Sequence, residues 1–408
     1  MPEGGRSRRS SQPFHARLRQ LAGPHHWIHA VDCAAPEPDD VWGDWVVEPS
    51  VALVLRLDAG SRERRLPRVV TAVVRIARED ATGWAKAVAN AAVEAARGIT
   101  GVAALELGPA GVRANTVVVG HDTPAEDVAR TVAYLEHADF TTGATYWLTR
   151  SPTDTSVLDG SPIPGRVLVT GAAGGLGAQT ARTLAAAGWT VVPSDLPGAD
   201  LEELAGSLEV TSLPLDVTDA RQVRALPRAS QLDDGLAGVA VMHGVGTSAA
   251  LGELDETAVR RAIAINGTGV HDVLRAILPL LEGGAPSAAV VLASQAGLRA
   301  EAYHVTYCAA KFAVVGLVRG LAGVLDDRDV RIHVLCPGPV DTPLMRRAFA
   351  GLAEGEGISP EEYRTRRIAA IPARRLGTPE DIADAVIHLF GLAATGVIAA
   401  PTGGESLT

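Results

Sequence analysis

Residues 165–408 carry short apolar runs that alternate with longer helix-like segments, and this alternation restricts the fold more than any other feature of the chain. The runs are RVLVT (166–170), TVVPSD (190–195), GVAVMHG (238–244), AAVVLAS (288–294) and VRIHVLCPG (330–338). Strands that alternate with helices form a parallel sheet that is covered on both faces. The pattern therefore predicts an α/β fold with a doubly wound parallel sheet.

The first of these runs leads directly into a glycine-rich segment, TGAAGGLGAQTARTLAAAGW at 170–189. Gly171, Gly175 and Gly177 stand where the strand becomes a helix, so a pyrophosphate can approach the positive end of the helix dipole. By itself such a turn is weak evidence, because tight strand-to-helix connections use glycine for steric reasons.

Asp195 strengthens the nucleotide-binding interpretation. It ends the next apolar run, 18 residues after Gly177 (195 − 177 = 18). A carboxylate there accepts hydrogen bonds from an adenosine ribose and repels a 2′-phosphate. Because no Arg or Lys stands in the glycine turn or just after Asp195, NAD(H) is favoured over NADP(H). The alternative is that Asp195 is a solvated turn residue.

A second candidate site is the pair Tyr307 and Lys311 in TYCAAKFA, 306–313. Residues four apart lie on one face of a helix, and an ammonium beside a phenol can make that phenol a usable acid near neutral pH. Taken alone, the pair also fits an ordinary amphipathic turn.

Residues 165–408 resemble the short-chain dehydrogenase/reductase family, which has a Rossmann fold. Ser294 precedes Tyr307 by 13 residues (307 − 294 = 13), and the motifs lie in the order expected for that family. The motifs are TGAAGGLG (170–177), LDV (215–217), AINGTG (264–269), LASQAG around Ser294, YCAAK (307–311), CPGPVDTPL (336–344) and LGTPEDIADAV (376–386).

The resemblance implies four catalytic residues. Tyr307 is the general acid or base, and Lys311 lowers the pKa of the phenol and holds the nicotinamide ribose. Ser294 bonds the reacting oxygen, and Asn266 holds a water that links Lys311 to solvent.

The resemblance also implies a set of cofactor contacts. Asp216 contacts the adenine amino group and Thr342 the nicotinamide carboxamide. His243 stands where the family has a different turn, and we interpret it as a structural turn residue rather than a second acid. No metal ligand is expected. The expected cofactor-binding residues are Gly171, Gly175, Leu176, Gly177, Asp195, Asp216, Val217, His243, Gly244, Tyr307, Lys311, Pro337, Gly338, Val340 and Thr342.

The earlier part of the chain repeats the pattern of the later part. The glycines that end two similar segments are 218 residues apart (338 − 120 = 218), and the same offset lays VVTAVVRI at 69–76 on the strand that ends at Ser294. Ordered apolar matches of this kind indicate an internal repeat. The matched segments are 111–120 with 329–338, 122–135 with 377–390, and 141–148 with 394–401.

The repeat lacks the chemistry of its counterpart. Ser294, Tyr307 and Lys311 fall on Ile76, Ala89 and Val93, and residues 1–150 contain no phosphate-binding glycine turn. We therefore expect a flexible basic tail (1–22), a degenerate, catalytically silent half-domain (23–150), a linker (151–164) and a catalytic domain (165–408). Our hypothesis is that the half-domain replaces a partner subunit as an intramolecular pseudo-dimer. The alternative is an N-terminal domain that folds separately.

Composition excludes several classes of protein. A net charge of −10 and a pI near 5.6 argue against a nucleic-acid surface. No uninterrupted apolar run reaches the length of a bilayer span and the N-terminus lacks a signal-peptide pattern, so we expect a cytoplasmic location without membrane contact. The cysteines Cys33, Cys308 and Cys336 match neither a disulfide framework nor zinc-ligand spacing, and we interpret them as reduced thiols.

The leading functional hypothesis is a nicotinamide-dependent oxidoreductase acting on a ketone or a secondary alcohol. Two alternatives stay open: a non-enzymatic NAD(H)-binding sensor or scaffold, and a redox-neutral epimerase or dehydratase. The lid segment, residues 344–377, holds seven arginines and the acids Glu354, Glu356, Glu361 and Glu362. The arginines can attract an anionic or acyl-carrier-bound substrate, or they can form surface salt bridges. Further self-association of the chain is also open.

Overall fold

The computed structural model describes residues 26–32, 67–76, 84–120, 123–148, 165–233, 235–249, 255–281, 287–299, 301, 304–325 and 328–406. The expected basic tail (1–22) and linker (151–164), together with Cys33, lie outside the described residues. The chain divides into two compact units. Unit 2 comprises Pro152–Ala370 and Leu376–Thr402, whereas unit 1 comprises Met1–Ser151 and two short later segments, Ile371–Arg375 and Gly403–Thr408.

Unit 2 contains a seven-stranded sheet in the order β11-β10-β9-β8-β5-β6-β7, in which every neighbouring pair is parallel. All five apolar runs contribute a strand, which confirms the predicted parallel sheet. The strands are β5 (Arg166–Thr170), β6 (Thr190–Asp195), β7 (Leu213–Pro214), β8 (Leu236–Val241), β9 (Ser287–Leu292), β10 (Val330–Leu335) and β11 (Ile398–Ala399).

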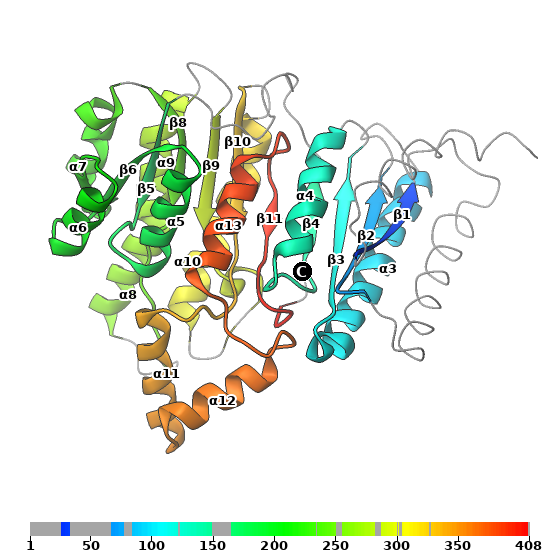
Figure 1. Cartoon of the computed structure of the whole chain (residues 1–408). Helices are drawn as coiled ribbons and strands as arrows, with labels where there is room; N and C mark the ends of the chain where they lie inside the picture. The colour runs from blue at the N-terminus through cyan, green and yellow to red at the C-terminus, as the bar shows by residue number, and fades with distance from the viewer. Residues whose placement is uncertain are drawn as a thin grey trace, which may run out of the picture. The chain divides into compact units, whose positions relative to one another are not determined.

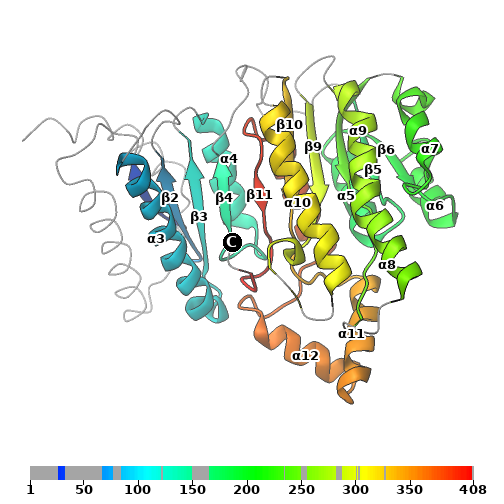
Figure 2. The same ribbon diagram turned by 180° about the vertical axis from the view of Figure 1, so that it is seen from behind.

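Helices cover both faces of this sheet. Figure 1 shows α5 and α13 over one face, and Figure 2 shows α9 and α10 over the other. Aliphatic side chains of the strands pack with α9 and α10 into one buried core, as near-continuous apolar strands require. The helices are α5 (Gly175–Ala186), α6 (Ala199–Ser207), α7 (Ala220–Ala225), α8 (Glu256–Ile263), α9 (Gly269–Leu281), α10 (Val305–Leu325), α11 (Pro343–Glu356), α12 (Pro360–Ala370) and α13 (Pro379–Phe390). Short turns η4 (Leu226–Arg228), η5 (Ser230–Leu232), η6 (Ala264–Thr268) and η7 (Gln295–Gly297) connect them.

Unit 1 contains a parallel four-stranded sheet in the order β1-β2-β3-β4. Its core consists of valines and alanines from β2, β3 and α3. Two later segments of the chain belong to this unit, since Gly403 donates its N–H to the carbonyl of Phe140 (2.8 Å) and Arg375 lies 5.0 Å from the Phe140 ring centre. The elements are β1 (His26–Asp32), β2 (Val69–Arg75), α3 (Trp84–Leu107), η3 (Gly108–Ala110), β3 (Arg113–Val119), α4 (Ala125–His137) and β4 (Thr145–Leu148).

The last strands of the two units are reached through the same hydrogen bonds. In unit 1, Ala114 donates its N–H to the hydroxyl of Thr142 (2.9 Å) and accepts from the N–H of Gly143 (2.7 Å). In unit 2, Ile332 donates to Thr395 (2.9 Å) and accepts from Gly396 (2.8 Å). Both glycines adopt positive φ, 70° and 74°, which favours glycine. The matched pairs keep the offset of 218 on the strand (332 − 114 = 218).

One stretch of the described residues, Val305–Ala322 in α10, is long and apolar enough to cross a membrane, and 44% of it is buried inside the protein. Core helices of globular proteins share this property, so the stretch is weak evidence for a span.

Candidate active site

The glycine turn between β5 and α5 has almost no room for side chains. A Cβ on Gly171 would lie 2.6 Å from the backbone of His243, and one on Gly177 would lie 2.1 Å from the carbonyl oxygen of Gly171. The N-cap of α5 is Gly174, which supplies no side-chain capping bond. The first N–H groups of α5 therefore face the turn without a side-chain cap, as a phosphate-binding turn requires. Leu176 lies in the same first turn of α5.

Asp195 lies at the end of β6 and contacts the glycine turn directly. Its carboxylate accepts hydrogen bonds from the N–H of Ala173 (2.9 Å) and the N–H of Leu196 (2.7 Å). These bonds hold a negative charge beside the turn, on the partly exposed end of the strand. Asp195 is therefore not a freely solvated turn residue.

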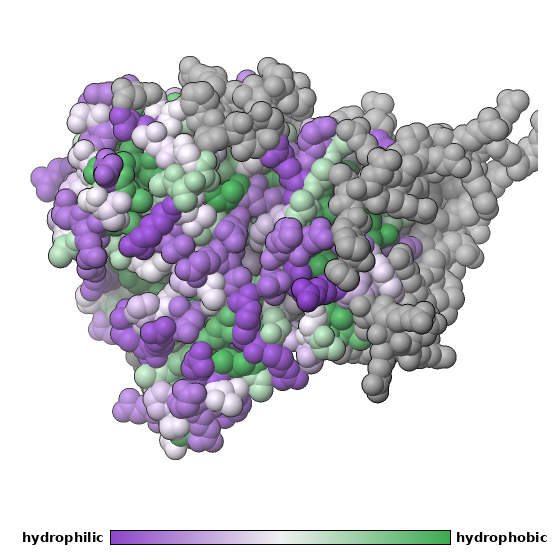
Figure 3. Space-filling model, in the orientation of Figure 1, coloured by the Kyte–Doolittle hydropathy of each residue, from purple (hydrophilic) through white to green (hydrophobic). Residues whose placement is uncertain are grey.

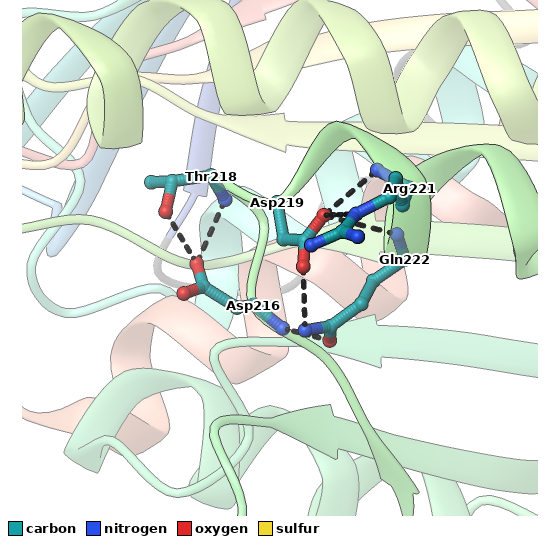
Figure 4. A network of polar contacts seen from close by, with 5 residues as sticks. All are labelled: Asp216, Thr218, Asp219, Arg221 and Gln222. Carbon is teal, nitrogen blue, oxygen red and sulfur yellow. Dashed lines mark hydrogen bonds and ion pairs between the residues drawn. The ribbon is translucent and has the colours of Figure 1, made fainter.

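Asp216 and Val217 follow β7, the strand next to β6. Figure 4 shows that Asp216 belongs to a polar network with Thr218, Asp219, Arg221 and Gln222. Val217 packs on the start of α9, because a Cβ on Gly269 would lie 3.1 Å from its Cγ2 atom.

His243 joins the ends of β8 and β5. Its Nδ1 atom lies 2.8 Å from the hydroxyl of Thr170, which also accepts the N–H of Met242 (3.2 Å). Burial lowers the pKa of His243 to about 3, and the nearby charge of Lys311 lowers this pKa further. The imidazole is therefore neutral at physiological pH, a state that suits the structural interpretation and not proton donation.

Asn266 lies in the π-helical turn η6, between α8 and α9. Both functional atoms of its amide bond the backbone of Val245: Oδ1 accepts the N–H (3.0 Å), and Nδ2 donates to the carbonyl (2.9 Å). A Cβ on Gly244 would lie 2.8 Å from Asn266 Oδ1 and 3.5 Å from Lys311 Nζ. Gly244 therefore keeps open the space between Asn266 and Lys311.

Ser294, Tyr307 and Lys311 converge at the carboxyl end of β9. Ser294 follows this strand, whereas Tyr307 and Lys311 project from α10. The Lys311 ammonium lies 5.7 Å from the Tyr307 ring centre and donates to the carbonyl of Leu292 (3.1 Å). His304 packs edge-on against the Tyr307 ring, with centroids 6.4 Å apart.

Burial controls the acidity of this group. It raises the pKa of Tyr307 to about 12, and the hydrogen bond with Ser294 offsets only part of this rise. Burial also lowers the pKa of Lys311 to about 8. This result differs from the sequence-based expectation that the charge of Lys311 lowers the pKa of Tyr307, because both groups lose more hydration than they gain from each other.

The loop after β10 borders the same site. Pro337 accepts the N–H of Gln295 (2.9 Å), and Gly338 packs on Thr402, whose Cα would lie 2.8 Å from an added Cβ. Val340 pairs with Gly377 in a single parallel bridge, which closes the base of the lid segment.

Thr342 caps α11, since its hydroxyl accepts the N–H of Met345 (3.2 Å). Its Cγ2 atom would lie 3.6 Å from a Cβ on Gly175. The start of the lid segment and the glycine turn are therefore adjacent in unit 2.

The arginines of the lid segment form ion pairs. Asp341 accepts from Arg346 (2.7 Å) and lies 3.6 Å from Arg364, and these arginines hold the pKa of Asp341 below its usual range. Arg366 bonds Glu356. Hydrophilic residues dominate the lid helices on the face seen in Figure 3. These contacts favour the salt-bridged interpretation of Arg346, Arg364 and Arg366.

The structure adds residues that the motifs did not indicate. Thr170, Val245 and Leu292 bond His243, Asn266 and Lys311, respectively, from distant parts of the chain. Two of these three act through backbone groups, so no residue type in the sequence could have indicated them. Cys308 and Cys336 are buried free thiols, and burial raises the pKa of Cys336 to about 12. Within the described ranges, no cluster of three or more His, Cys, Asp or Glu side chains could hold a metal ion.

Comparison with known proteins matches residues 171–401 to the protein-family model described as enoyl-(acyl carrier protein) reductase. A 2-keto-3-deoxy-L-fuconate dehydrogenase of Xanthomonas campestris pv. campestris is 31% identical over 226 residues, which cover 55% of this chain and 73% of the relative. A cis-4-hydroxycyclohexanecarboxylate dehydrogenase of Sinomonas cyclohexanicum is 35% identical over 241 residues, which cover 57% of this chain and 92% of the relative. Among solved structures, an actinorhodin polyketide ketoreductase with NADPH matches with a TM-score of 0.57 and 26% identity, covering 59% of this chain and 97% of that one.

Proposed function

Because the chain belongs to the short-chain dehydrogenase/reductase family through residues 171–401, we propose that it is an NAD(H)-dependent oxidoreductase that interconverts a ketone and a secondary alcohol. The observation that carries this proposal is the convergence of Ser294, Tyr307 and Lys311 at the carboxyl end of β9. A phenol, a hydroxyl and an ammonium at one place provide proton transfer and orientation for a carbonyl oxygen.

Each catalytic side chain has a separate task. The phenol of Tyr307 donates a proton to the carbonyl oxygen in reduction and, as phenolate, accepts one from the alcohol in oxidation. The hydroxyl of Ser294 bonds the same oxygen and keeps it within reach of the phenol. The Lys311 ammonium supplies positive charge beside the phenol. The amide of Asn266 is occupied by Val245, so it contributes by holding the loop after β8 in place. We propose that any water it presents to Lys311 is bound by its backbone.

The residues present fit a nicotinamide dinucleotide. The glycine turn leaves space that a Cβ would fill, and the N-terminus of α5 lacks a side-chain cap. The bound dinucleotide supplies the hydride. We propose NAD(H) rather than NADP(H), because the carboxylate of Asp195 is held against the glycine turn, where it would repel a 2′-phosphate.

The direct test is a turnover assay with the full-length protein, NADH and a panel of ketones that includes 3-oxoacyl thioesters. Tyr307→Phe should lower kcat about 10²- to 10⁴-fold and leave NADH affinity within about twofold. Tyr134→Phe is the matched control, since its hydroxyl contacts Thr141 within unit 1; turnover should not change. Full activity of Tyr307→Phe would mean that the proton comes from another group. NADH binding without turnover of any ketone or alcohol would favour the non-enzymatic sensor or scaffold.

We further propose that unit 1 is a catalytically silent half-domain that takes the place of a partner subunit. The shared strand order and the shared hydrogen bonds at the last strand support its origin as a repeat. Without residues 1–150, Gly403 and Arg375 would lose their contacts with Phe140. A fragment of residues 160–408 should therefore aggregate or lose stability in size-exclusion chromatography and thermal unfolding. A monodisperse and fully active fragment would refute this proposal.

A further inference from the structure

The carboxylate of Asp216 is held in one orientation by Thr218. Its Oδ1 atom accepts two hydrogen bonds from that residue, one from the backbone N–H (2.8 Å) and one from the hydroxyl (2.6 Å). Figure 4 shows both bonds. Two donors on the same oxygen select one side-chain rotamer.

Gln222 holds the backbone of the same residue. Its Oε1 atom accepts the N–H of Asp216 (2.9 Å), and its Nε2 atom donates to Asp219 (3.2 Å). Asp219 is the N-cap of α7 and accepts the N–H of Arg221 (2.8 Å). One amide side chain therefore joins the end of β7 to the start of α7.

Three features make the other carboxylate oxygen of Asp216 suitable for reading a base. No hydrogen bond reaches Oδ2 from the described part of the chain, and Asp216 is partly exposed. The residue lies one strand from Asp195, whose carbonyl accepts the N–H of Leu215 (2.7 Å). Ionised carboxylates only accept hydrogen bonds. Such an oxygen accepts an amino group and opposes a carbonyl oxygen.

We propose that Thr218 and Gln222 are positioning residues, which hold Asp216 so that it selects the 6-amino group of adenine against a 6-oxo purine. This inference rests on the proposed function, because it assumes that the dinucleotide binds at this edge of the sheet. Neither residue touches the base; both act through the orientation of the Asp216 carboxylate.

The experiment compares two dinucleotides on the full-length protein. NADH and reduced nicotinamide hypoxanthine dinucleotide differ at position 6 of the purine, where oxygen replaces the amino group. Their dissociation constants are measured by fluorescence titration. The wild-type protein should bind NADH about tenfold more tightly, the value of one hydrogen bond to a charged group. Gln222→Met and Thr218→Val should each reduce this ratio to about threefold or less, and Thr218→Ser should restore it.

The ratio separates positioning from a general loss of stability, since a smaller folded fraction affects both titrations of one variant equally. Gln231→Met is the matched control, because its amide bonds the Ser212 carbonyl (3.1 Å) outside the network; the ratio should stay at its wild-type value. Equal affinity of the wild-type protein for both dinucleotides would overturn this inference alone. An unchanged ratio in both Gln222→Met and Thr218→Val would overturn the positioning role. Failure of the wild-type protein to bind NADH would instead overturn the proposed function.

Discussion

Alcohol oxidation by this protein should accelerate strongly with pH, because the phenol of Tyr307 must lose its proton before it can accept one from an alcohol. Burial raises the pKa of Tyr307 to about 12. At pH 7 the ionised fraction is therefore about 10⁻⁵, and it grows about tenfold with each pH unit. Between pH 7 and pH 9 we expect kcat/KM for the alcohol to rise about 100-fold.

Ketone reduction should behave differently, since it uses the protonated phenol, which stays the dominant form throughout this range. Its kcat/KM should therefore be almost independent of pH between pH 7 and pH 9. Ser294→Ala removes the hydrogen bond that lowers the pKa of Tyr307, so it should decrease the oxidation rate at every pH while the tenfold rise per unit persists.

The assay follows the nicotinamide absorbance in initial-rate measurements with saturating NAD⁺ and a secondary alcohol identified in the turnover panel. Hydroxide-dependent decay of the cofactor is subtracted with Tyr307→Phe, which lacks the titrating group. A flat oxidation profile between pH 7 and pH 9 would refute the reasoning. It would mean that the phenol ionises below pH 7 and that a nearby charge, not burial, determines its pKa.

Three further perturbations have defined outcomes. Asp195→Gly combined with Leu196→Arg should shift the preference between NADH and NADPH by about 100-fold toward NADPH in binding titrations, because repulsion of the 2′-phosphate is replaced by attraction. Gly177→Ala should abolish NADH binding or lower Tm, because its Cβ would lie 2.1 Å from the carbonyl oxygen of Gly171. His243 is neutral when folded, with a pKa of about 3 against 6.5, so the unfolded state binds more protons below pH 6.5. Its share of the stability is present above pH 6.5 and should fall by about 2 kcal/mol between pH 7 and pH 5 in denaturant titrations.

Each outcome has its own contradiction. Unchanged discrimination in the Asp195 and Leu196 double variant would place the ribose elsewhere. Normal NADH affinity and normal Tm in Gly177→Ala would mean that the turn is not tightly packed. His243→Asn should remove about 2 kcal/mol of the acid sensitivity, and equal acid sensitivity of the two proteins would show that His243 is already accessible to protons.

Local patterns in the sequence were sufficient for the elements that carry the site. The run RVLVT became β5, and the glycines after it became the start of α5. The four-residue spacing placed Tyr307 and Lys311 on one helix, α10. Thr378 and Asp381 formed a capping box at the start of α13. Patterns of this kind are decided by neighbours within one or two turns of chain, so a single sequence can reveal them.

Contacts between distant residues were not predictable in the same way. His243 pairs with Thr170, which is 73 residues away, and the amide of Asn266 is occupied by the backbone of Val245. The ion pairs of Asp341 with Arg346 and Arg364 decided between the two interpretations of those arginines. A charge pattern alone allows either pairing or ligand attraction, and only geometry separates them.

The amino-acid sequence by itself determined the parallel sheet, the glycine turn and the order of the catalytic residues, because strand and helix periods and backbone sterics are local properties of the chain. Only the tertiary structure decided the acidity of Tyr307 and Lys311 and the single orientation of Asp216. The physical reason is that desolvation and hydrogen-bond geometry depend on all the atoms packed around a group, and most of those atoms come from distant parts of the chain.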